Sequence, residues 1–167
     1  VITSNKIQDA PDLPALVLDS AAGGVPDGTY VADNYIENEN TARTQEMMHL
    51  HGALNTTVKG NVFRRSGAVD IGLVNCDGTQ IISNLFVEPN VINNLNRAVI
   101  ESNDSNPHTL VVTDNEMIKG KLGKAQGFIW TADNNTQVRM SGNRMDDKGD
   151  VLVRSPTSNI ISDTDSI

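Results

Sequence analysis

The stretch TTVKGNVFRRSGAVDIGLVN, residues 56–75, contains the pattern that decides the fold. An apolar residue, Val58, lies three positions before Asn61, and another, Phe63, lies two positions after it. Side chains of a strand alternate between two faces, so both residues can point inward only if the chain bends between them. Asn suits such a bend because it tolerates left-handed backbone and its amide can bond nearby main chain. The stretch therefore predicts a strand, a corner at Asn61 and a second strand.

The same pattern recurs along the chain. Six asparagines share this environment: Asn5, Asn34, Asn61, Asn84, Asn115 and Asn143. The apolar residues three positions before them are Ile2, Val31, Val58, Ile81, Val112 and Met140. The apolar residues two positions after them are Ile7, Ile36, Phe63, Phe86, Met117 and Met145. A repeat of this kind predicts stacked coils in which the asparagine amides form a column, each bonded to the next.

A further short strand is predicted between successive corners. Its copies read LPALVLD (13–19), EMMHLHG (46–52), GAVDIGLVN (67–75), NRAVIES (96–102), GFIWTAD (127–133) and GDVLVRS (149–155). Each repeat therefore holds three short strands, and the segments of variable length between them are predicted to be loops.

These repeats resemble the right-handed parallel β-helix of the pectate-lyase-like superfamily, most closely in residues 56–75 and in TQIISNLFV (79–87). The predicted fold class is all-β, a right-handed parallel β-helix solenoid of about six coils with three short strands per coil. The solenoid is assigned to residues 1–154 and a C-terminal tail to 155–167. The alternative is a β-sandwich or barrel, in which Asp27-Gly28 and Asp77-Gly78 would form hairpin turns.

A stacked solenoid exposes unpaired strand edges at both ends. The first repeat begins at residue 1 without a capping helix, and the tail SPTSNIISDTDSI (155–167) is polar and short. We therefore expect a partner to cover the end coils, either further copies of the chain in a homo-oligomer such as a trimer, or flanking domains.

The amino-acid composition excludes several classes of partner and binding site. The formal net charge of −8 argues against nucleic acid and anionic membranes as partners. No apolar run approaches the roughly 18 residues of a membrane helix. The single Cys76 excludes an internal disulfide framework and a multi-cysteine zinc site. We expect no cofactor, no metal site, and a location outside the cell or on a virion surface.

One group of polar residues is a candidate binding site. In GAVDIGLVN, alternation places Ile71 inside and Asp70 outside. The same register in the neighbouring repeats brings His49, His51, Asp70 and Glu101 to the outer face, about 5 Å apart per coil. Such residues could hold a metal or act on a glycosidic bond, and they could equally be ordinary solvated side chains. Trp130 is predicted to pack in the core together with Phe128.

The resemblance implies fold more strongly than function, because the superfamily includes lyases, hydrolases, tailspikes and non-catalytic surface proteins. The hydrolases' clustered Asn-Thr-Asp, Asp-Asp, Gly-His-Gly and Arg-x-Lys set is absent. Only Asp146-Asp147 and His51-Gly52 resemble parts of it. No catalytic residue is therefore assigned. The favoured function is a rigid structural or interaction module of a virion, tail-spike or cell-surface assembly that can contact polysaccharide. The alternative is a polysaccharide-active lyase or glycoside hydrolase, or a fragment of one, with its groove on the outside of the sheet formed by the further strands.

Overall fold

The computed structural model describes residues 1–8, 14–20, 24–38, 46–92, 98–103, 108–123, 125, 127–131 and 136–146, and the backbones of 151–154 and 160–163. The described elements are strands that form three parallel sheets, here called A, B and C. Sheet A contains β1 (Ile2–Thr3), β4 (Tyr30–Ala32), β7 (Thr57–Lys59), β10 (Thr79–Ile82), β13 (His108–Thr113), β16 (Thr136–Ser141) and β19 (Ile160–Asp163). Sheet B contains β2 (Lys6–Gln8), β5 (Tyr35–Glu37), β8 (Val62–Arg64), β11 (Leu85–Val87), β14 (Glu116–Ile118) and β17 (Arg144–Met145). Sheet C contains β3 (Leu16–Asp19), β6 (Met48–His51), β9 (Ile71–Val74), β12 (Ile100–Ser102), β15 (Gly127–Thr131) and β18 (Val151–Arg154).

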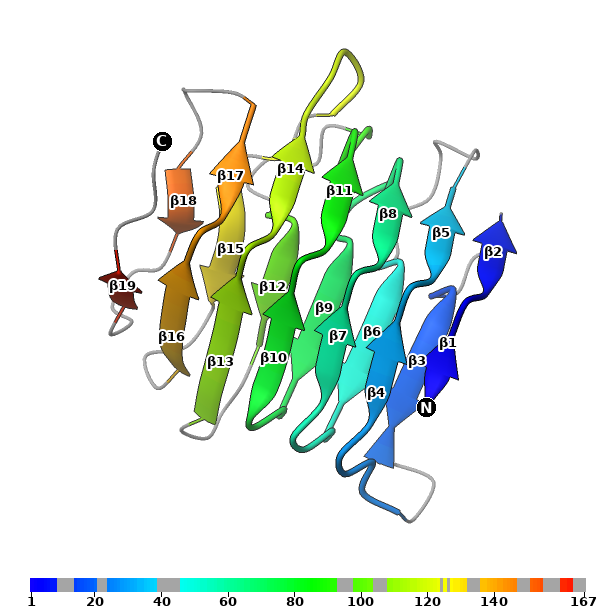
Figure 1. Cartoon of the computed structure of the whole chain (residues 1–167), viewed down its shortest axis with the longest axis vertical. Coiled ribbons are helices and arrows are strands. Elements are labelled where there is room, and N and C mark those ends of the chain that lie inside the picture. The colour runs from blue at the N-terminus through cyan, green and yellow to red at the C-terminus, as the bar shows by residue number, and fades with distance from the viewer. Residues whose placement is uncertain are drawn as a thin grey trace.

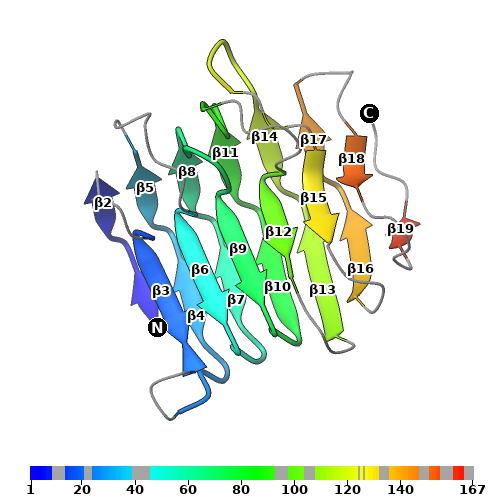
Figure 2. The ribbon, with the colours of Figure 1, turned by 180° about the vertical axis from the view of Figure 1, so that it is seen from behind.

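The chain passes through sheets A, B and C in turn, and each strand pairs in parallel with the equivalent strand of the next coil. Figure 1 shows sheets A and B in front of sheet C, and Figure 2 shows sheet C from behind. Parallel pairing between successive coils requires crossover connections, which excludes a hairpin sandwich. The predicted parallel β-helix with three strands per coil is confirmed.

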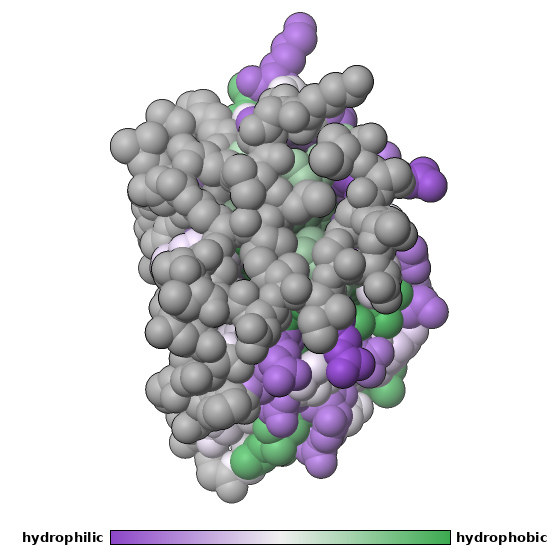
Figure 3. All heavy atoms as spheres, turned by 90° about the vertical axis from the view of Figure 1, so that its left-hand side faces the viewer, coloured by the Kyte–Doolittle hydropathy of each residue, from purple (hydrophilic) through white to green (hydrophobic). Residues whose placement is uncertain are grey.

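Strand β19 lies in the segment 155–167 that the sequence assigns to a polar tail. It pairs in parallel with β16, with Val138 opposite Ile160 and Ser141 opposite Asp163. The strand ladder of sheet A therefore continues into this segment. Figure 3 views the molecule from the end that carries β18 and β19, and the described residues visible from this side, mostly toward the lower right, include both hydrophilic and hydrophobic ones.

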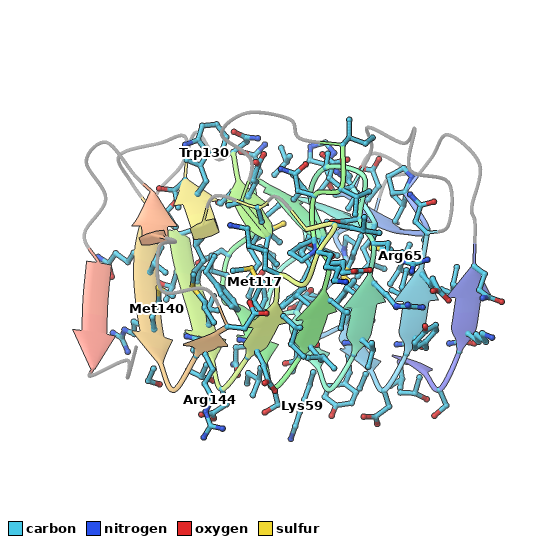
Figure 4. All side chains as sticks on the ribbon, turned by 90° about the horizontal axis from the view of Figure 1, so that it is seen from above. Lys59, Arg65, Met117, Trp130, Met140 and Arg144 are labelled. Carbon is cyan, nitrogen blue, oxygen red and sulfur yellow. The ribbon has the colours of Figure 1, made fainter. Side chains whose placement is uncertain are left out.

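The core follows the sequence repeat. The predicted residue three positions before each asparagine faces its equivalent across sheet A, as Val58 faces Val31 and Ile81. The residue two positions after each asparagine does the same in sheet B, where the rings of Phe63 and Phe86 stack with centroids 5.2 Å apart. Figure 4 shows Met117 inside the solenoid, while Lys59 and Arg144 point away from it.

The predicted asparagine column forms a continuous hydrogen-bond ladder at the corner between sheets A and B. Each side-chain amide nitrogen donates to the Oδ1 atom of the asparagine in the next coil, from Asn5 to Asn143, at 2.9–3.0 Å. The left-handed backbone, however, belongs to the residue before each asparagine and not to the asparagine itself, as at Asp33 (φ 55°) and Gly60 (φ 64°). This arrangement leaves the asparagine side chain free to point into the stack.

Candidate functional site

The outer face of sheet C brings four residues of successive coils into one column. The strand register places His49 opposite Gly72, Gly72 opposite Glu101, and Glu101 opposite Trp130. Neighbouring positions in such a column are about 4.8 Å apart. The column therefore contains an imidazole, a carboxyl group and an indole, and Gly72, which has no side chain, separates the imidazole from the carboxyl group.

His49 and Glu101 share this face, as the sequence predicts. The His49 side chain is 27% exposed. Glu101 is only 3% exposed, and its Oε1 atom accepts a hydrogen bond from the Ala98 N–H at 3.3 Å. The carboxyl group of Glu101 is therefore more enclosed than an ordinary groove side chain.

Glu46 fills the gap at Gly72. A Cβ atom at Gly72 would lie 2.7 Å from Cγ of Glu46, so the Glu46 side chain occupies the space that a side chain there would take. The Glu46 Oε2 atom lies 3.9 Å from Nδ1 of His49. Sequence reasoning missed Glu46 because it precedes strand β6, and the only signal for it was a glycine on an outward position of the next coil.

His51 belongs to a second outer column, beside Asp19 of the preceding coil. Its Nδ1 atom lies 3.0 Å from Oδ1 of Asp19, and the two side chains are 37% and 40% exposed. The rings of His49 and His51 lie on the same strand with centroids 6.3 Å apart. Asp19 was not among the candidates, because the sequence alone did not give the register between β3 and β6.

The predicted outward position of Asp70 is wrong. Met47, Asp70 and Val99 directly precede the paired residues Met48, Ile71 and Ile100, and all three are buried. The chain turns a corner at this position, so the alternation of strand β9 does not extend back to Asp70. Its Oδ2 atom accepts a hydrogen bond from the Ser66 hydroxyl group at 3.0 Å, whereas its Oδ1 atom has no hydrogen-bond partner. Burial raises the pKa of Asp70 to about 8.

The predicted core position of Trp130 is also wrong. Phe128 is buried, and its ring meets that of Phe86 with centroids 5.8 Å apart, but Trp130 is only partly buried. Phe128 and Ile129 are successive residues of β15 and are both buried, so the alternation does not hold at this point of the strand. Trp130 then lies on the outer face, on the side of the solenoid opposite Lys59 and Arg144 in Figure 4.

The outer face of sheet C offers a ligand hydrogen bonds and charge from His49 and Glu101, and an aromatic surface from Trp130. Within the described parts of the chain, no cluster of three or more His, Cys, Asp or Glu side chains could hold a metal ion. The described residues also include no helix long and apolar enough to cross a membrane.

The fold and the asparagine ladder define a parallel β-solenoid. A family model described as the right handed beta helix region matches residues 1–145. The chain therefore belongs to the right-handed β-helix family. No curated protein and no solved structure is significantly similar to the chain. A β-helix of this kind supports a structural or polysaccharide-related module in general.

Proposed function

We propose that the protein is a rigid structural and interaction module of a virion, tail-spike or cell-surface assembly, and that it joins its partner through the end of the solenoid formed by β1, β2 and β3. The observation that carries this proposal is the open edge at that end. Among the described strands, each of these three pairs on one side only, with β4, β5 and β6. Unpaired strand edges of this kind are templates for adding another strand.

All hydrogen bonds of the asparagine ladder run in one direction, from each side-chain amide to the Oδ1 atom of the asparagine in the next coil. The edge at β1 and β2 therefore presents an acceptor. The Oδ1 atom of Asn34 accepts hydrogen bonds from both the backbone N–H and the side-chain amide of Asn5. No donor among the described residues reaches the Oδ1 atom of Asn5, so this acceptor is open to a further coil. A strand that docks on this edge with an asparagine at the corner would extend the ladder by one step.

The inward side chains at this end are also incompletely covered. Ile2, Ile7, Leu16 and Leu18 pack against the core but stay only partly buried, unlike their equivalents in the following coils. A partner coil would remove this apolar surface from water, which favours association. Either a further copy of the chain, as in a trimer, or a flanking domain would provide such cover. The net charge of −8 suits a soluble surface module outside the cell or on a virion.

The proposal is tested by light scattering together with hydrogen exchange of the β1, β2 and β3 amides. We expect an assembly larger than 18.0 kDa that Ile7→Lys dissociates, or a monomer whose β1–β3 amides exchange much faster than those of β7 and β8. The matched control is Gln80→Lys, on an exposed position in the middle of sheet A, which should change neither result. A monomer with β1–β3 protected as well as β7 and β8 would overturn the proposal.

The outer face of sheet C favours a second candidate, a polysaccharide-active enzyme or a fragment of one. The Glu46 side chain fills the space over Gly72, beside His49, and Glu101 lies between Gly72 and Trp130 in the same column. Paired carboxyl groups can act as acid and base, or as acid and nucleophile, on a glycosidic bond. Incubation with a panel of acidic polysaccharides, with and without calcium, tests this candidate through new reducing ends or the ultraviolet absorbance of an unsaturated product. Activity that disappears in Glu46→Gln and Glu101→Gln but persists in Glu88→Gln would establish it.

A further inference from the structure

We propose that Asp70 is a proton-dependent latch: its neutral carboxyl group holds the corner before β9 against the segment after β11, and loss of its proton opens that corner. The inference does not depend on the proposed function. It rests on the hydrogen bonds and the surroundings of one buried side chain.

A chain of hydrogen bonds passes from Asp70 to the next coil. The Ser66 hydroxyl group donates to Oδ2 of Asp70 at 3.0 Å and accepts from the backbone N–H of Asn90 at 2.8 Å. The backbone N–H of Val91 also donates to the Ser66 carbonyl oxygen at 2.9 Å. Ser66, Asp70 and Asn90 are all fully buried. The corner at residues 66–70 and the segment at 90–91 are therefore linked through one serine.

The surroundings of Asp70 suit a neutral acid. Met47 of the preceding coil and Val99 of the following coil flank it, and no hydrogen-bond partner reaches its Oδ1 atom. Burial raises the pKa of Asp70 to about 8, and the hydrogen bond from Ser66 only partly opposes this effect. A buried carboxylate without a countercharge is costly, so ionisation favours any conformation that brings the group to water.

The charged groups on the neighbouring elements do not compensate an ionised Asp70. Glu46 and His49 on the preceding coil and Glu101 on the following coil belong to the outer column through Gly72. Arg65 and Glu88, next to the latch in the chain, bond each other, with Nε and Oε2 atoms 3.1 Å apart. None of these groups forms a hydrogen bond or an ion pair with Asp70.

The sign of the pH effect follows from the two states of the corner. When the corner opens, Asp70 reaches water and ionises near its ordinary value of 3.8, whereas in the closed corner it keeps its proton up to about pH 8. Opening therefore becomes about tenfold more favourable for each pH unit between about 4 and 8, and changes little above that range. Because β9 begins directly after Asp70, the opening also loosens the start of the strand that carries Gly72.

Hydrogen exchange at several pH values, corrected for the intrinsic exchange rate, tests the latch. We expect protection of the Asp70 and Val91 amides to fall by about tenfold per pH unit between about pH 5 and about pH 7. Asp70→Asn should abolish this dependence, because the amide group stays neutral. Glu46→Gln, the matched control, should keep it.

A second measurement covers the case in which Asp70→Asn fails to fold. Carbon NMR of the Asp70 carboxyl group in the unmodified protein should give a titration midpoint near 8. A midpoint near 4, exchange independent of pH, or the same pH dependence in Asp70→Asn would each overturn the latch.

Discussion

The side-chain amide of Asn34 donates to the Oδ1 atom of Asn61 at 2.9 Å, and the backbone N–H of Asn34 donates to the same oxygen at 3.0 Å. Both residues are buried, although 27 positions separate them in the chain. One side-chain oxygen thus satisfies two donors of the preceding coil. Buried donors are costly to leave unpaired, so the ladder stabilises the corners as well as marking them.

Loss of one ladder residue should weaken the whole solenoid. Asn61→Ala removes the acceptor for both donors of Asn34 and leaves the Oδ1 atom of Asn84 without the Asn61 amide. We expect the free energy of unfolding to fall by about 2–4 kcal/mol, measured by urea denaturation. The control is Asn55→Gly, which keeps left-handed backbone at an exposed asparagine bonded to Asp27 and should cost less than about 1 kcal/mol. Equal effects at the two positions would contradict a stabilising role for the ladder.

Substitutions at two glycines allow the cost of backbone strain to be distinguished from that of side-chain crowding. Gly60 and Gly28 have almost the same left-handed φ, 64° and 62°, but a Cβ atom at Gly60 would lie 2.7 Å from Oδ1 of Asp33, whereas one at Gly28 would meet nothing within 4 Å. Gly28→Ala should therefore show only the backbone cost, about 1 kcal/mol, and Gly60→Ala should cost more. Thermal denaturation of both variants tests the difference. If Gly28→Ala is as damaging as Gly60→Ala, the Asp33 side chain does not limit the space at this corner.

The sequence predicted the fold well because the core positions repeat in register with the asparagines. The apolar residues on both sides of each corner, such as Val58 and Phe63, line sheets A and B as expected. The site was harder to predict, because corners break the alternation by which faces are assigned. Asp70 directly precedes β9 and is buried, while Phe128 and Ile129 are successive buried residues of β15, so that Trp130 is turned outward. The contact of Glu46 with Gly72 depends on the stacking of coils, which no local pattern shows.

The outer face of sheet B contains an ion pair with a predictable pH dependence. Glu37 is almost buried and accepts hydrogen bonds from the Arg64 guanidinium, the Tyr35 hydroxyl group and the Gln8 amide. Burial alone would raise the pKa of Glu37, but these three partners together hold it below its ordinary value. The ionised form is thus favoured in the fold, and its contribution to stability is lost as the pH falls through the lowered pKa.

Removal of the cation should therefore matter most at neutral pH. Arg64→Gln leaves the Glu37 carboxylate without its countercharge, and we expect a loss of about 1–2 kcal/mol near pH 7 that shrinks near pH 3. Arg65→Gln breaks the pair with Glu88, a carboxylate that is more exposed than Glu37, and should cost less at either pH. Urea denaturation of both variants near pH 7 and near pH 3 measures these losses in the free energy of unfolding. A loss for Arg64→Gln that does not change with pH would mean that packing of the arginine stem, and not its charge, is what matters.

Asp70 should make the global stability fall as the pH rises, which is opposite to the effect of Glu37. The carboxyl group of the unfolded chain ionises near 3.8 and that of the folded chain near 8. The stabilising contribution of neutral Asp70 is complete below about pH 4 and is lost as the pH rises to about 8, at up to about 1.4 kcal/mol per pH unit. Asp70→Asn should remove this slope, since its side chain stays neutral in both states. The variant should therefore gain stability relative to the unmodified protein from about pH 5 to about pH 8, measured by urea denaturation. Glu46→Gln should keep the slope of the unmodified protein. A difference between Asp70→Asn and the unmodified protein that stays constant across this pH range would contradict this expectation, because it would mean that Asp70 ionises at the same pH in the folded and the unfolded chain.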